Sequence, residues 1–259
     1  MNNWWLCGIC VVCLAACGGE TEGRSITLRW VAGSAAQAEH NREFTTDTGW
    51  DVSLDEAFVA VGPVFALAPA KDELDAVAEW MRHALVPVAH AHGGHDAAGG
   101  LRVRAELLEP AMLDALSSDR VPLLTTEGEE GAVDTIKIEI AQKSSRLPEA
   151  LRGHQAYVRG RASRGSEQVQ FEGGLAELGD DEPSRRVEID VDFSLREGGE
   201  LGLTVNALEW FRHAEFDQLH APAGGVAQIS ADDQLGRAWK VGVRSPPAFE
   251  VSFTKAKKD

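Results

Sequence analysis

Apolar and polar residues alternate along much of the chain after residue 24, with the period of two that marks a β-strand. In the most regular segment Val187, Ile189 and Val191 alternate with acidic residues. One apolar face and one charged face are typical of a strand in an antiparallel sheet with one solvated side. The same alternation predicts strands at residues 26–30, 50–61, 101–107, 136–140, 201–205, 239–243 and 249–253.

Glycine-rich turn sequences separate these strands, as at Gly99-Gly100, Gly173-Gly174 and Gly198-Gly199. The strands do not alternate regularly with helices, as they would in a parallel α/β protein. The pattern therefore predicts a mainly β protein, built as an antiparallel β-sandwich with two short helices.

The two helices are predicted from apolar residues at helical spacing. Residues 72–85 place their apolar side chains on one face, and Pro87 follows them. Residues 207–220 follow Asn206, a suitable N-cap, and Pro222 stops the segment. We expect both helices to lie beside the sheet.

The first residues have a different pattern, with an apolar run at residues 4–16. A helix of this length would extend about 20 Å, which is short of the roughly 30 Å hydrocarbon core of a bilayer. This length favours a signal peptide over a membrane span. The sequence Leu14-Ala15-Ala16-Cys17 then resembles the lipobox of bacterial lipoprotein precursors.

The lipoprotein resemblance implies diacylglycerol transfer to the Cys17 sulfur, cleavage before Cys17 and acylation of the new amino group. Several acyl chains together hold a protein stably on a membrane. Because Gly18 rather than aspartate follows the cysteine, the resemblance also implies the outer membrane, facing the periplasm or the cell surface. The alternative interpretation is a plain secretory signal or a buried N-terminal helix.

These observations predict three regions. Residues 1–16 form the signal peptide, residues 17–24 a lipidated flexible tether, and residues 25–259 the β-sandwich domain. The polar region near 118–133 offers an alternative, in which two smaller sandwiches meet there.

Charge and cysteine content narrow the function classes. The chain has 25 Lys and Arg residues against 41 Asp and Glu. The resulting formal net charge of −16 would repel nucleic acid, so we expect no nucleic-acid partner. Its cysteines are Cys7, Cys10, Cys13 and Cys17, so cleavage would leave one, and that one is acylated. Disulfides, thiolate metal sites and cysteine nucleophiles are therefore excluded from the mature domain.

Histidines supply the strongest candidate chemistry. His83, His90, His92 and His95 fall close together, and Asp96 follows them. Neutral imidazole is a common metal ligand, and a glycine-containing loop allows several rings to converge on one ion. In an extended segment His90 and His92 would point to the same side, about 6.5 Å apart. This predicts a site for Zn²⁺, Cu²⁺ or Ni²⁺, and the segment loosely resembles the histidine-rich loops of periplasmic metal-binding proteins.

The same segment also fits a solvated connector, in which His83 merely lies at the C-terminus of a helix. A second histidine cluster, with His213, Asp217 and His220 at helical spacing, would share one helix face. The alternative for that cluster is the polar face of a helix whose apolar face packs on the sheet. Likewise, five tryptophans fit the core better than a ligand groove: Trp30, Trp50, Trp80, Trp210 and Trp239.

No phosphate-binding glycine loop and no G-x-S-x-G sequence is present. We therefore expect a non-enzymatic, lipid-anchored envelope protein that binds a divalent transition metal through the histidine segment. The alternative is a structural or assembly lipoprotein that contacts another envelope protein or a glycan and has no metal role. An unrecognised hydrolase is the third hypothesis.

Overall fold

The computed structural model describes residues 23–68, 96–97, 101–141, 148–176, 185–223 and 225–256. Several predicted features lie outside these residues, so they stay predictions. They are the signal peptide, Cys17, the helix at 72–85, and His83, His90, His92 and His95.

The described residues are mainly β-structure, which confirms the predicted fold class. The strands are β1 (Ser25–Ala32), β2 (Glu43–Thr45), β3 (Asp51–Leu67), β4 (Asp96–Ala97), β5 (Leu101–Leu107), β6 (Ala111–Asp114), β7 (Val121–Glu129), β8 (Gly131–Ile140), β9 (Ala156–Arg164), β10 (Glu167–Leu175), β11 (Arg186–Leu195), β12 (Gly199–Val205), β13 (Ala227–Ile229) and β14 (Phe249–Lys255). The helices are α1 (Ala35–Arg42), α4 (Ala207–Phe211) and α5 (Gln234–Val243), with 3-10 turns η1 (Glu149–Leu151) and η2 (Pro246–Ala248).

The strands pair in the order β13-β10-β9-β3-β5-β7-β1-β12-β14, while β8 pairs with β3 and β11. The described pairs are antiparallel except for β1 with β12 and β10 with β13. The sheet is therefore mixed, with parallel pairing at two places in a mainly antiparallel arrangement. Hairpins force antiparallel pairing, but both parallel pairs join strands that are distant in sequence, where no hairpin constrains the direction.

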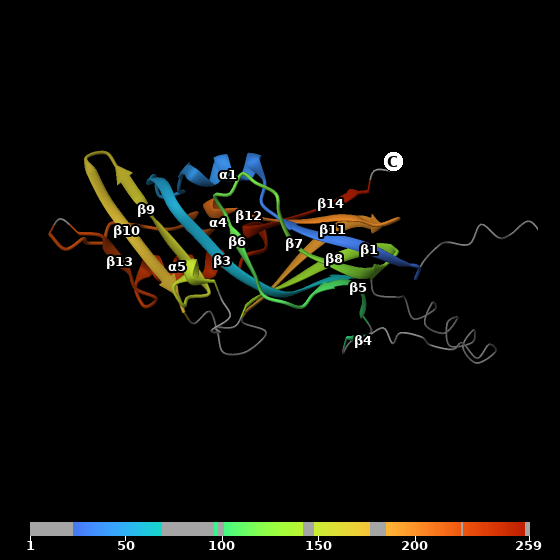
Figure 1. Ribbon diagram of the computed structural model, residues 1–259. Coiled ribbons are helices and arrows are strands. Elements are labelled where there is room, and N and C mark those ends of the chain that lie inside the picture. Colours follow the sequence, from blue (N-terminus) through green and yellow to red (C-terminus); the bar gives the residue numbers. More distant parts are fainter. Residues whose placement is uncertain are drawn as a thin grey trace, which may run out of the picture.

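Strand β3 runs through both halves of the molecule (Figure 1). Its first half, residues 51–59, pairs with β9, and its second half, residues 61–67, pairs with β8. Gly62 lies at the start of the second half, within the register shift between Val61 and Val64; its φ is 135°, and a Cβ there would be 2.8 Å from the Cα of Pro110. A glycine is therefore required at the point where β3 changes partners.

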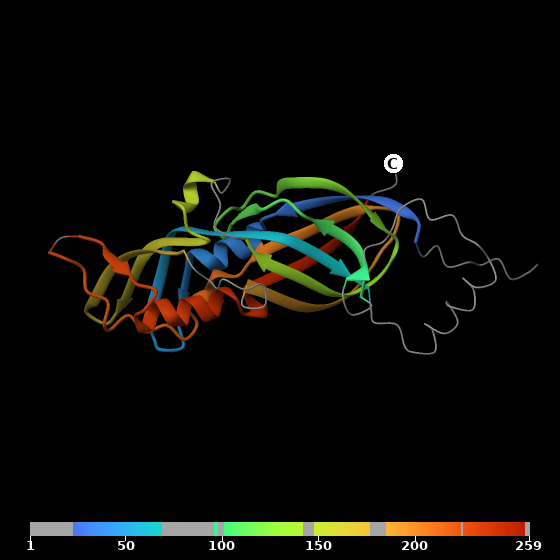
Figure 2. The ribbon, with the colours of Figure 1, turned by 90° about the horizontal axis from the view of Figure 1, so that it is seen from below.

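The molecule is elongated, and its two ends differ (Figures 1 and 2). We call one end the N-terminal end, where the start of β1, the β7–β8 turn, the β11–β12 turn and the end of β14 lie together. The other end, the hairpin end, is formed by the turn between β9 and β10.

The core lies where the predicted apolar faces point. Ile136, Ile138 and Ile140 of β8 are fully buried, as the alternation indicated. Near the hairpin end, Phe171 and Phe216 have ring centroids 5.2 Å apart, and further aromatic rings surround them. The described tryptophans of the predicted core set are all buried, namely Trp30, Trp50, Trp210 and Trp239.

The helix predicted at 207–220 is shorter than expected, since α4 ends at Phe211. The chain then turns, and Ala214 and Phe216 are buried in the core. The hydroxyl of Thr48 donates to the carbonyl oxygen of Ala214 at 2.5 Å, which fixes this turn against the β2–β3 connection. Tertiary contacts thus end the helix before Pro222.

The strand predicted at 239–243 is wrong, because these residues belong to α5. Trp239 and Val243 are buried, whereas Val241 is 63% exposed. Residues 239 and 243 are four apart, so the spacing fits one helix face as well as alternate strand positions. The side chain of Asp233 caps the helix by accepting a hydrogen bond from the amide of Gly236 at 2.6 Å.

Candidate functional site

The described part of the fold begins six residues after the predicted lipid attachment site. The amide nitrogen of Gly23 lies 3.2 Å from the carbonyl oxygen of Glu130, and the Glu130 amide donates to Arg24 at 2.8 Å. Ser25 then pairs with Glu129 at the start of β1. Main-chain pairing therefore starts within the predicted tether, six residues after Cys17.

Buried polar groups hold this N-terminal end together. Arg104 is 5% exposed and donates to the carbonyl oxygen of Glu130 at 3.0 Å. The Glu130 side chain is itself buried, and its Oε1 accepts from the amide of Glu197 at 2.8 Å. Lys255 pairs with the Glu197 carboxylate at 2.9 Å. The β7–β8 turn, the β11–β12 turn and β14 are thus joined at one place.

The two residues that flank the histidine segment, residues 69–95, both pair with Arg102. At the end of β3, the amide of Ala68 donates to the carbonyl oxygen of Arg102 at 2.8 Å. Asp96 of β4, which follows His95 directly, pairs with Arg102 in β5. The Arg102 guanidinium also binds the carboxylate of Glu129, with nitrogen and oxygen 2.8 Å apart. Both flanks of the segment therefore adjoin the N-terminal end.

The second histidine cluster does not form on a single helix face, so that prediction is wrong. His213 lies beyond the end of α4, and its Nδ1 is 3.0 Å from a carboxylate oxygen of Asp47. Asp217 instead binds Arg164, and His220 lies in the segment after α4. Within the ranges that the structure covers, no group of three or more His, Cys, Asp or Glu side chains could hold a metal ion.

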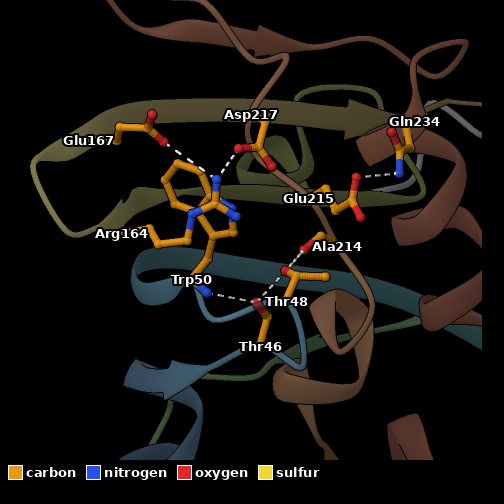
Figure 3. Close-up of polar contacts among 9 residues, drawn as sticks. All are labelled: Thr46, Thr48, Trp50, Arg164, Glu167, Ala214, Glu215, Asp217 and Gln234. Atoms are coloured by element: carbon orange, nitrogen blue, oxygen red, sulfur yellow. Dashed lines mark hydrogen bonds and ion pairs between the residues drawn. The ribbon is translucent and has the colours of Figure 1, made fainter.

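A cluster around Trp50 joins several loops at the hairpin end (Figure 3). The Arg164 guanidinium lies over the Trp50 ring, 4.7 Å from its centroid, and pairs with Asp217 and Glu167. The Trp50 amide donates to the hydroxyl of Thr46 at 3.1 Å. These contacts join the β2–β3 connection, the β9–β10 hairpin and the segment after α4, which indicates that the cluster positions the loops.

A second polar cluster, which the sequence pattern did not predict, lies on β9, β10 and β13. The Tyr157 hydroxyl donates to the carboxylate of Glu172 at 3.3 Å, and Gln228 donates to the same carboxylate at 2.8 Å. Burial, and then the negative charge of Glu172, raise the pKa of Tyr157. The hydrogen bond from Gln228 lowers the pKa of Glu172. The Arg152 guanidinium covers the Tyr157 ring, 4.4 Å from its centroid.

Two shallow hollows lie over strands β3, β9 and β10, with volumes of about 210 and about 460 Å³. Arg161 lines both of them. The larger is also lined by Ser53, Ser163 and Asp51, but no histidine lines either hollow. These two hollows therefore do not supply the serine–histidine or aspartate–histidine pair that a hydrolase of the third hypothesis would require.

The chain has little detectable similarity to known proteins. No protein-family model matches the chain, and no curated protein matches it. Among solved structures, MbnP from Methylosinus trichosporium aligns over 89% of this chain and 98% of its own, with 10% identity and a TM-score of 0.39. A similarity this low assigns neither a fold family nor a function. In the part of the chain that the structure describes, no helix is long and apolar enough to cross a bilayer.

Proposed function

We propose that this protein is an envelope lipoprotein, anchored through acyl chains on Cys17, whose domain is a non-enzymatic binding module for a divalent transition metal. The metal ligands in this proposal are His90, His92 and His95, with His83 as a further ligand. The proposed location is the outer membrane, facing the periplasm or the cell surface.

One structural observation supports the metal-binding part of the proposal. The backbones of Ala68 and Asp96, which flank the histidine segment, are both paired with Arg102. The two residues that flank the segment are therefore held close together, and His95 directly precedes one of them. Fixing both ends lowers the entropy lost when several imidazoles converge on one ion.

Metal binding is tested on the mature protein by metal analysis and by thermal unfolding with micromolar Zn²⁺, Cu²⁺ or Ni²⁺. Bound metal stabilises the folded state by mass action, so at least one ion should raise the Tm. The triple variant with alanine at positions 90, 92 and 95 should lose this shift. The control is His213→Ala, which removes a histidine that pairs with Asp47 and should keep the shift. No metal-dependent shift in the unsubstituted protein would exclude the metal role.

Anchoring is tested separately by the intact mass of protein extracted from membranes. We expect a chain that begins at Cys17 and carries the mass of its acyl groups. The variant Cys17→Ser should lose both the added mass and the membrane association. An unmodified chain in the soluble fraction would contradict the lipoprotein proposal.

A structural or assembly role is the second candidate, and β7 supplies an observation in its favour. Val121 and Leu124 are exposed large apolar side chains on this strand, 47% and 37% exposed. Exposed apolar groups are commonly used to contact partner proteins. Cross-linking from Leu124 to another envelope protein, with the histidine triple variant behaving like the unsubstituted protein, would favour this second candidate.

A further inference from the structure

The N-terminal end of the molecule gathers chain segments from across the sequence. Leu28 in β1 pairs with Gly199 at the start of β12, and Gly199 pairs with Lys255 near the end of β14. The amide of Ala256 donates to the carbonyl oxygen of Gly198 at 3.4 Å. This end is therefore one connected surface, and the hairpin end lies at the opposite extreme (Figures 1 and 2).

The chain between Cys17 and this surface is short. Gly23 is six residues from Cys17, which allows a reach of about 20 Å when fully extended. Strand β3 has 17 residues and would be about 55 Å long if it were straight. An acylated Cys17 would thus hold the N-terminal end close to the bilayer, while the hairpin end could move away from it.

Two carboxylates at this end are paired with cations, whereas the exposed Glu127 has no ion pair among the described residues. Glu129 pairs with Arg102 at 2.8 Å, and Glu197 pairs with Lys255 at 2.9 Å. An exposed Arg24 lies at the start of β1. Anionic lipid headgroups attract exposed cations and repel uncompensated carboxylates. Pairing of these two carboxylates therefore weakens the repulsion between this end and anionic lipid.

One side of the molecule carries a row of acidic residues on β11, of which Glu188 lies 3.8 Å from the Arg186 guanidinium. Glu188, Asp190 and Asp192 are exposed at alternate positions of β11. They share one face of the strand. If the domain lay flat on this side, the carboxylates of Asp190 and Asp192 would face an anionic bilayer and would be repelled.

We propose that the N-terminal end is a lipid-facing surface, and that the domain stands end-on on an anionic bilayer with the hairpin end directed away. This inference rests on the acylation of Cys17 in the proposed function. Its partner is the layer of lipid headgroups. The short reach of the tether and the charge of the two surfaces together set the orientation.

Two matched cysteine variants test the orientation on the full acylated protein. Glu127→Cys places a thiol at the N-terminal end, and Glu167→Cys places one at the hairpin end. Both replace an exposed glutamate of a strand, and the mature chain has no other thiol once Cys17 is acylated. A fluorophore on each thiol is measured in vesicles of phosphatidylethanolamine and phosphatidylglycerol that contain a headgroup quencher.

We expect several-fold stronger quenching at position 127 than at position 167. Equal quenching, or stronger quenching at 167, would overturn the end-on orientation. The intact mass separates the two possible failures. A chain without acyl groups would refute the proposed function together with this inference, whereas an acylated chain with equal quenching would refute the orientation alone.

A longer tether provides a second test. Inserting about twenty flexible Gly and Ser residues between Gly19 and Glu20 would lengthen the reach beyond the dimensions of the domain. The quenching difference between positions 127 and 167 should then fall. A difference that stays unchanged would show that tether length does not set the orientation. That result would contradict the role given to the short separation between Cys17 and Gly23.

Discussion

Asn41 provides the sharpest test of how the domain is held together. This side chain on α1 is fully buried. Its Nδ2 donates to the carbonyl oxygens of Ala115 and Val205, at 2.6 and 2.7 Å. Its Oδ1 accepts from the amide of Ala207 at 2.8 Å, which satisfies the first turn of α4. One amide thus connects α1, the loop after β6, the end of β12 and α4.

The variant Asn41→Leu keeps the approximate volume and removes these three buried hydrogen bonds, together with the part-buried one from Gln37. Each buried group left without a partner costs about 1–3 kcal/mol, so the three together predict a loss of about 3–9 kcal/mol. Domains of this kind are stable by about 5–15 kcal/mol. We therefore expect Asn41→Leu to be severely destabilised or to fail to fold.

Urea unfolding of the mature chain carrying Cys17→Ser measures this loss. Gln37→Ala is the matched control, because the Gln37 amide also donates to the Asn41 Oδ1, at 3.2 Å, but is only half-buried. The control should lose less than about 1 kcal/mol. If Asn41→Leu loses no more than the control, the three buried hydrogen bonds do not have the assigned role.

Three further predictions concern packing and pH. A Cβ at position 242 would lie 2.6 Å from the carbonyl oxygens of Glu209 and Trp210, so Gly242→Ala should cost more than about 2 kcal/mol in urea unfolding. Val241→Ala, at an exposed neighbour, should stay within about 0.5 kcal/mol, and equal losses would contradict the close packing of α5 on α4. Because the pKa of Glu172 is lowered in the fold, its contribution to stability is present above its ordinary pKa of 4.5 and is lost as pH falls through the lower, folded value. The variant Glu172→Gln should therefore flatten the acid limb of the stability curve, and an unchanged limb would refute this assignment. Tyr157 is the chain's one tyrosine, and its pKa is raised, so its absorbance should titrate above pH 10.0, and stability should fall as pH rises through that folded value. A tyrosinate midpoint at or below 10.0 in the folded protein would count against the buried position of the ring.

Sequence patterns predicted those strands whose two faces differ strongly in polarity. β11 was predicted in this way, since apolar residues alternate there with acids. β9 was missed because its buried face includes Ala156, Gly160 and Ala162, whose small side chains give little hydrophobic contrast. β7 was missed because many of its side chains are exposed on both faces, so no alternation marks the strand.

The candidate functional residues were likewise predictable only in part. Local motifs, namely the lipobox at Cys17 and the clustered histidines, are visible in the sequence because their residues are neighbours in the chain. The pairing of Ala68 and Asp96 with Arg102 depends on strand register between distant segments. Register follows from the packing of whole sheet faces, which no short segment encodes.

The position of β1 within the sheet determines how the domain would bear mechanical load. β1 is hydrogen-bonded on both sides, antiparallel to β7 and parallel to β12, and it is the first strand after Cys17 in the sequence. A force applied through the preceding chain would act on both hydrogen-bond ladders in shear, so that many bonds must break together. An edge strand pulled from its end across the ladder would instead unzip one bond at a time. The entry of the chain into an interior strand thus gives the fold a force-resistant attachment point.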